Sequence, residues 1–182
     1  MTAIDHRSLR NVLGCFATGV AVLTTRTVEG EHAAVTVNSF SSVSLDPPLV
    51  LFSLAKNSNV LQHFQNARGF AVNVLSHRQE VLSNMFARPS SANWDETEFV
   101  EGENGCALFS NSLAQIECAP HAEIDGGDHR VFFGLVTHLH LHSTIDPLLF
   151  YRSRYGTYLR SQWEKIAVED GSLSDFSIGG WG

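Results

Sequence analysis

Hydroxyl and amide side chains crowd residues 36–58, between two strongly apolar runs of the chain. This segment reads TVNSFSSVSLDPPLVLFSLAKNS. Many short hydrogen-bonding groups beside a buried strand, with the cation of Lys56 nearby, suit a bound polar ligand that carries a phosphate. Ser and Asn side chains also cap their own backbone in loops, and the segment on its own favours that simpler interpretation.

A second candidate is His129, which follows the turn-forming residues Gly126, Gly127 and Asp128. A histidine at such a turn can reach a cleft, where its imidazole can donate a hydrogen bond or a proton near neutral pH. The simpler alternative is a turn histidine that faces only water.

Three further histidines, His138, His140 and His142, alternate along one expected strand and therefore share one of its faces. Their spacing along a single strand suits a four-ligand metal site poorly, and no Cys or acidic residue joins them in the sequence. We therefore expect a solvated strand face and no metal site.

The composition bounds the class of protein. The chain has 182 residues, 43% of them hydrophobic, which suits one domain with a sizeable core. Its formal net charge is −7 and it has no basic run, so we expect no nucleic-acid partner. No apolar run has the length of a membrane helix, and the N-terminus lacks the apolar core of a signal peptide. Three widely spaced cysteines suit free thiols, so we expect a cytoplasmic protein without a membrane partner.

The elements that must position these residues are mostly strands. Apolar spacing predicts a helix over residues 5–16, and shorter helices begin near residues 58 and 81. Apolar and β-branched runs predict strands at 20–27, 33–40, 49–54, 69–75, 113–124, 131–142 and 148–151. Residues 88–105 are expected to form a loop. The pattern predicts a mostly β fold with short helices, in which the strands form a closed or nearly closed antiparallel barrel. No GxGxxG or P-loop motif is present, so side chains and loop amides would have to hold any nucleotide.

Five segments, in this order, resemble the flavin reductase family of FMN-binding split barrels, the reductase components of two-component flavin-dependent monooxygenases. They are ATGVAVLTT at 17–25, the hydroxyl-rich segment at 36–58, FAVNVLS at 70–76, GDH at 127–129 and PLLFYRSRYG at 147–156. The resemblance implies one flavin reductase-like domain over residues 1–158, followed by a tail at 159–182.

The resemblance also implies a fold and an activity. The fold would be a Greek-key split β-barrel that forms a homodimer, with flavin near the interface. The activity would be reduction of FMN or FAD by NADH, with NADPH possible, and delivery of reduced flavin to a partner monooxygenase. NADH is favoured by family habit and because the sequence has no obvious Arg cluster for a 2′-phosphate. The alternative is a flavin-binding module or oxidase without reductase turnover.

Site residues follow from the resemblance by position. The flavin ring and ribityl chain would be lined by Thr36, Val37, Asn38, Ser39, Ser41 and Ser42. The ribityl and phosphate end would be held by Ser53, Leu54, Ala55, Lys56, Asn57, Ser58 and Asn59, with a hydroxyl donor in Ser58 and a counter-charge in Lys56. The phosphate or adenylate end would be reached from Phe86, Ala87 and Arg88. Trp94, in the following loop, would either plug that loop or cover the flavin.

The nicotinamide side follows in the same way. His129 matches the position that meets the nicotinamide and is the candidate catalytic residue. Tyr151, Arg152 and Ser153 match a segment beside the nicotinamide cleft. Orienting the nicotinamide is a better-suited role for His129 than acid catalysis, because hydride transfer itself needs no proton.

Overall fold

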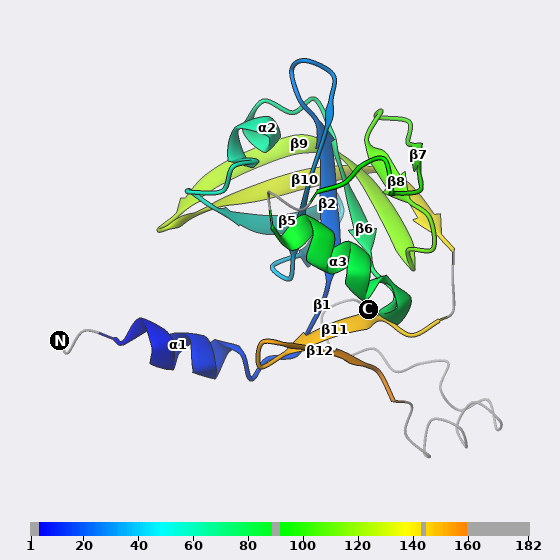
Figure 1. Ribbon diagram of the computed structural model, residues 1–182. Coiled ribbons are helices and arrows are strands. Elements are labelled where there is room, and N and C mark those ends of the chain that lie inside the picture. The colour runs from blue at the N-terminus through cyan, green and yellow to red at the C-terminus, as the bar shows by residue number, and fades with distance from the viewer. Residues whose placement is uncertain (1–3, 89–91, 143–144, 160–182) are drawn as a thin grey trace.

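The computed structural model describes residues 4–88, 92–142 and 145–159, so the expected tail lies almost entirely outside the described residues. Its centre is a seven-stranded antiparallel sheet in the order β3-β2-β6-β9-β10-β5-β4 (Figure 1). The strands are β2 Ala21–Arg26, β3 His32–Val37, β4 Ser41–Leu45, β5 Pro48–Ala55, β6 Phe70–Val74, β9 Ala114–Gly126 and β10 His129–Leu141. Because the two edge strands β3 and β4 are consecutive in the chain, the sheet curls until its edges approach at residues 38–40.

Smaller elements surround this barrel. One three-stranded sheet has the order β1-β11-β12, and β7 pairs with β8. Their bounds are β1 Thr18–Gly19, β7 Phe99–Glu101, β8 Ala107–Phe109, β11 Leu148–Tyr151 and β12 Arg154–Thr157. The helices are α1 His6–Leu13, α2 Leu61–Gln65 and α3 Glu80–Ala87, and a single 3₁₀ turn, η1 His77–Gln79, precedes α3. None of the described helices is both long and apolar enough to cross a membrane.

The main core fills the barrel with aromatic rings. Phe52 stacks on Phe132 with ring centroids 5.0 Å apart and meets Phe70 edge-on at 5.1 Å. Such pairs stabilise a core beyond the area they bury. Gly134 makes this packing possible, since a β-carbon there would lie 2.3 Å from Cζ of Phe70.

A second core lies between α3 and β8. Phe86 stacks on Phe109 with ring centroids 5.2 Å apart, and Trp94 packs against both rings. Trp94 therefore plugs its own loop against the barrel. Leu148 of β11 belongs to the same cluster and fixes the three-stranded sheet to the body.

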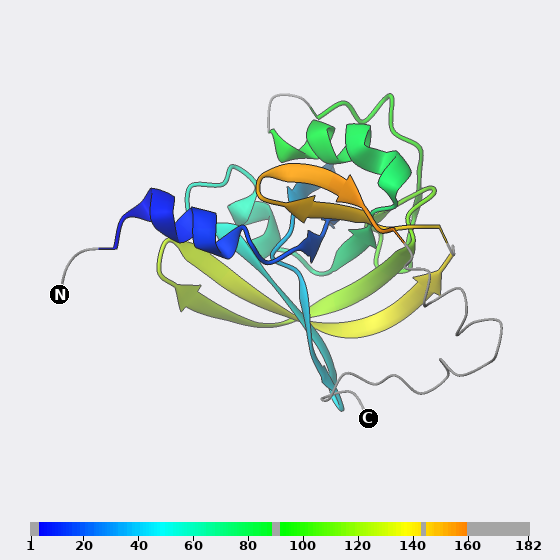
Figure 2. The ribbon, with the colours of Figure 1, turned by 90° about the horizontal axis from the view of Figure 1, so that it is seen from below.

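Helix α1 forms where the apolar spacing predicts it, but it packs differently from most amphipathic helices. None of its residues is buried. Its apolar side chains are exposed, at 43% for Leu9, 69% for Val12 and 63% for Leu13. Figure 2 shows the helix reaching away from the barrel rather than lying on it.

The predicted hairpins, the central strand β6 and the short helices are confirmed, and with them the mostly β fold. Five strands were not predicted, and two of them, β1 and β8, have only two and three residues. Ser41–Leu45 was read only as part of a ligand-binding segment, because its five residues are polar or exposed and lack the alternation of a half-buried strand. The expected loop at 88–105 contains β7, and β12 follows β11, but these strands have only three and four residues.

Candidate functional site

Two segments far apart in the sequence meet at one edge of the barrel. His129 at the start of β10 pairs with Ala55 at the end of β5, and Val131 pairs with Ser53. The backbone amide of Lys56 donates a hydrogen bond of 2.9 Å to the carbonyl of Asp128. The GDH turn therefore lies directly beside the segment that was expected to hold the ribityl and phosphate end of a flavin.

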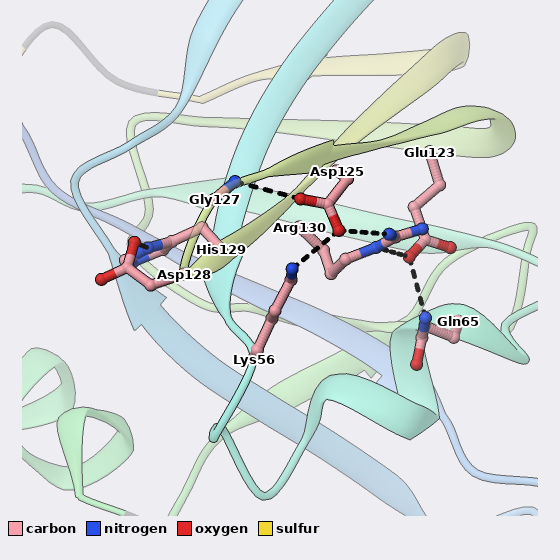
Figure 3. Close-up of polar contacts among 8 residues, drawn as sticks. All are labelled: Lys56, Gln65, Glu123, Asp125, Gly127, Asp128, His129 and Arg130. Carbon is pink, nitrogen blue, oxygen red and sulfur yellow. Dashed lines mark hydrogen bonds and ion pairs between the residues drawn. The ribbon is translucent and has the colours of Figure 1, made fainter.

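Ion pairs hold the turn of the β9–β10 hairpin in place. Nζ of Lys56 lies 2.7 Å from Oδ2 of Asp125, and Nη1 of Arg130 lies 3.2 Å from the same oxygen (Figure 3). The hydrogen bond from Lys56 and a second one from the amide of Gly127 lower the pKa of the Asp125 carboxyl. The ammonium of Lys56 is thus engaged within the chain, and a ligand phosphate would have to compete with Asp125 for it.

His129 lies on the other side of the same turn. Its Nδ1 is 2.7 Å from Oδ1 of Asp128, and its side chain is 44% exposed (Figure 3). An ionised carboxylate can only accept, so Nδ1–H donates to it and Nε2 is the other hydrogen-bonding atom of the imidazole. The bond from His129 lowers the pKa of Asp128. Asp128 thereby fixes the orientation of the imidazole.

Some side chains of the hydroxyl-rich segment form hydrogen bonds within the protein, and others are exposed. Ser39 bridges to β5, with its Oγ donating to the Ser53 carbonyl at 3.0 Å and accepting from the Ser53 amide at 3.1 Å. Thr36 donates to the Ser83 carbonyl at 2.7 Å, which ties β3 to α3. The side chains of Asn38 and Ser42 are exposed beside them.

Core positions account for other expected residues. Val37 and Leu54 are buried in the main core, at 9% and 3% exposure, and Phe86 is buried in the second core at 3%. Their side chains therefore pack in the interior and support the expected site from inside. Ala87 at the end of α3 is exposed, as are Asn57 and Ser41.

A cavity of about 290 Å³ brings the two expected phosphate-end segments together. Asn59, which follows β5, and Arg88, which follows α3, line the same space. Amide and guanidinium donors from two directions suit a phosphate, so this donor set fits the end of a flavin nucleotide. Ser58 precedes α2 and is partly buried, with its amide donating to the Ala55 carbonyl at 2.9 Å.

Sequence reasoning missed His32 and His63 in the lining of this cavity and left the role of Trp94 open. The ring of His32 packs 5.2 Å from that of Trp94, and burial lowers the pKa of His32. The two ring planes are inclined by 31°, so the pair contributes aromatic edges and faces to the cavity lining. No motif could have identified these residues, because they come together only through the fold.

The turn at Tyr151, Arg152 and Ser153 lies elsewhere, between β11 and β12. The amide of Arg152 donates to the Gly14 carbonyl at the end of α1, at 3.0 Å. No hydrogen bond or ion pair within the described ranges links this turn to His129. A different contact connects the hairpin to the flavin side, since the hydroxyl of Tyr155 lies 2.8 Å from Oγ of Ser83.

The three alternating histidines differ in exposure: His138 on β10 and His142 just after it are exposed, whereas His140 on β10 is partly buried. Nε2 of His140 lies 2.9 Å from Oε1 of Glu117, which is fully buried, and His142 bonds to Gln115. Burial acts to raise the pKa of Glu117, but hydrogen bonds from the Asn104 amide and His140 outweigh it and the pKa is lowered. The expected solvated face is therefore wrong for His140. The described residues contain no group of three or more side chains arranged to hold a metal ion.

Comparisons with known proteins give a consistent result. Residues 13–159 match the family described as "Flavin reductase like domain". The chain is 44% identical over 156 residues to "FMN reductase (NADH) SmoA" of Agrobacterium fabrum, covering 86% of this chain and 88% of that protein. It is 37% identical over 168 residues to "Flavin-dependent trigonelline monooxygenase, reductase component" of Acinetobacter baylyi, covering 92% of this chain and 54% of that one. The chain spans about half the length of several curated relatives that it matches.

A solved structure agrees in fold. The structure of "NADH:FAD oxidoreductase SgcE6 in complex with NAD and FAD fragments", from Streptomyces globisporus, superposes with a TM-score of 0.82 at 36% identity, covering 89% of this chain and 99% of that one. The expected split barrel is thereby confirmed, together with the resemblance found in the sequence. The match spans the barrel, the hydroxyl-rich segment and the GDH turn, and this chain belongs to the flavin reductase family.

Proposed function

We propose that this protein is an NADH-dependent flavin reductase, which reduces FMN or FAD and supplies reduced flavin to a partner monooxygenase. One observation carries the proposal: the GDH turn with His129 lies beside the Ser53–Asn59 segment, so residues expected to hold two different ligands border one edge of the barrel. A module that only carried flavin would not need the second set. The names of the SmoA and trigonelline monooxygenase relatives support the same assignment.

The chain's own residues would bind and orient two ring systems. When bound, the two cofactors would supply the hydride chemistry between them, so the protein would need no nucleophile of its own. Nε2 of His129 would hydrogen-bond the nicotinamide carboxamide, with Asp128 holding the imidazole in place. Asn38, Ser42 and the backbone amides between them would donate to the polar edge of the flavin, where negative charge develops on reduction.

The phosphate end of the flavin would enter the cavity between Asn59 and Arg88. Both FMN and FAD carry a phosphate at this point, so the cavity accepts either on chemical grounds. His32 and Trp94, which line the same cavity, would give the adenine of FAD aromatic side chains to contact. The ammonium of Lys56 would contribute positive electrostatic potential at the phosphate end while remaining paired with Asp125.

The proposal includes a homodimer. Leu9, Val12, Leu13 and Phe16 form an apolar surface on and after α1, with Phe16 78% exposed. Leu45, at the tip of the β4–β5 hairpin, is 68% exposed. Exposed apolar patches of this kind mark association surfaces, and a second copy of the chain is the occupant that the family resemblance implies. Sedimentation of the wild type at the mass of two chains, and of Leu13→Glu at the mass of one, tests it.

We also propose a cytoplasmic location, which the three free cysteines support. The activity itself is tested by NADH consumption with added FMN or FAD. A rate that requires both protein and flavin supports the proposal. Binding of flavin without any turnover, with either flavin and either nicotinamide, would instead support the alternative of a carrier module.

A further inference from the structure

A groove of about 460 Å³ lies where the end of α1 meets the β11–β12 turn. Arg10, Gly14 and Cys15 line it from the helix side, and Arg152 and Ser153 line it from the turn. Two guanidinium groups from opposite ends of the described chain therefore border one open space. No cluster of arginines is visible in the sequence, because only the fold brings these two together.

The backbone holds this groove in a defined shape. The amide of Arg152 donates to the Gly14 carbonyl at 3.0 Å, and the Gly14 amide donates to the Arg10 carbonyl at 2.8 Å. Arg152 and Ser153 both adopt positive φ, at 47° and 61°. Neither is glycine, so the turn carries a conformational cost that the surrounding contacts must offset. The turn therefore fixes the position of the Arg152 backbone, from which the side chain extends.

No carboxylate among the described residues neutralises the arginine charges in the groove. Within the part of the chain that the structure describes, neither Arg10 nor Arg152 forms an ion pair with a carboxylate. The guanidinium of Arg152 lies 5.4 Å from the centre of the Tyr151 ring, and its Nη2 lies 3.6 Å from Sγ of Cys15. In a chain with a formal net charge of −7, two such arginines at one groove indicate an anionic ligand. Their planar, multidentate donors suit phosphate oxygens in particular.

The groove is placed suitably for the dinucleotide of the proposed reaction. Tyr151 and the Arg152 turn belong to the segment expected beside the nicotinamide. Helix α1, which carries Arg10, lies on the same side of the barrel as the β9–β10 turn that carries His129 (Figures 1 and 2). A dinucleotide whose nicotinamide lies at His129 would therefore have to extend toward α1 for its pyrophosphate to reach the groove.

We propose that Arg10 and Arg152 bind the pyrophosphate of NADH. This inference rests on the proposed function and adds a residue, Arg10, that no motif marks. It also gives α1 a role in substrate binding besides association. The arginines would act on binding of the dinucleotide and leave the hydride-transfer geometry at His129 unchanged, so their effect falls on KM rather than kcat.

The test measures binding and kinetics in parallel, on the full chain. Titration calorimetry with ADP-ribose, which has the pyrophosphate but no nicotinamide, is run on the wild type, Arg10→Gln and Arg152→Gln. Arg7→Gln is the matched control, since Arg7 is exposed on the same helix and does not line the groove. We expect each groove variant to weaken ADP-ribose binding and raise the KM for NADH about tenfold, with kcat unchanged, because each loses one charge-assisted contact. Arg7→Gln should behave as the wild type.

Two results would overturn the inference: no binding of ADP-ribose by the wild type, or groove variants that match Arg7→Gln in both measurements. The inference and the proposed function fail separately. A protein that binds ADP-ribose through both arginines but does not consume NADH would reject the reductase and keep the groove. Normal NADH turnover, with the same KM for NADH in the wild type and in both groove variants, would keep the reductase and reject the groove as the binding site. If Arg152→Gln lowers the melting temperature, Arg10→Gln decides, since the Arg10 side chain is exposed.

Discussion

His129 pairs with Ala55 across the neighbouring strands β10 and β5, and the amide of Lys56 bonds to the carbonyl of Asp128 just beyond that pair. This register makes one continuous edge from two segments that the sequence keeps far apart. Because strand pairing fixes the position of both segments, a ligand bound by one lies next to the other. The proposal of a two-ligand site depends on this relationship.

Replacing His129 should impair use of the nicotinamide. We expect His129→Ala to lower kcat/KM for NADH by about tenfold, because one orienting hydrogen bond is lost, and to leave the affinity for flavin unchanged. Steady-state kinetics and flavin titration measure the two effects. His121→Ala is the control, since His121 is exposed on the paired strand β9. Unchanged KM and kcat in His129→Ala would rule out the assigned role.

Replacing Arg88 should impair use of the flavin. Arg88 shares a cavity with Asn59, where we place the flavin phosphate. We expect Arg88→Gln to raise the dissociation constant for FMN and FAD about tenfold, with the KM for NADH unaffected. Fluorescence titration with each flavin measures this, and Arg68→Gln serves as an exposed control. Equal flavin affinity in both variants would show that the flavin phosphate does not bind at Arg88.

The barrel core should not tolerate a side chain at position 134. A β-carbon on Gly134 would lie 2.3 Å from Cζ of Phe70 and 2.9 Å from Cβ of Cys118. We expect Gly134→Ala to lower the free energy of unfolding by about 1–3 kcal/mol, measured by urea denaturation. Gly19→Ala is the control because no atom lies within 4 Å of its added β-carbon. Equal stability of the two variants would contradict the packing described for the main core.

The three thiols should differ sharply in reactivity. Burial raises the pKa of Cys106 and of Cys118 to about 12, whereas Cys15 is exposed. At pH 8 only about one in ten thousand of the buried thiols would be ionised, and reactivity follows the thiolate. We expect a disulfide reagent to modify one thiol quickly in the native protein and all three after denaturation. Cys15→Ser should remove the fast phase, and rapid reaction of two thiols in the native wild type would argue against this burial.

The sequence was enough to predict the elements that carry strong patterns. The β2–β3 and β9–β10 hairpins follow from apolar and β-branched runs on either side of Gly30 and Gly127, both of which adopt positive φ. Strand β4 was missed because its hydrogen bonds to β5, rather than its side chains, make it a strand. Apolar periodicity predicted α1, but it gave no sign that the apolar face would remain exposed.

Site residues were predictable only where they lie within a segment that resembles the family. The pairings Asn59 with Arg88 and Arg10 with Arg152 depend on tertiary structure, and the sequence offers no signal for either. The same holds for Lys56, whose ion pair with Asp125 depends on the register between β5 and β10. Thr36 and Ser39 carry the expected side chains, but their hydroxyls are bonded within the chain.

The central claim is that one edge of the barrel brings NADH and flavin together for hydride transfer. The most direct measurement is anaerobic mixing of NADH with the protein and one equivalent of FMN or FAD, followed by the loss of flavin absorbance in a single turnover. We expect rapid bleaching with the wild type and His121→Ala, and clearly slower bleaching with His129→Ala at the same NADH concentration. Bleaching no faster than in a protein-free mixture, with both flavins and with NADH and NADPH, would contradict the account.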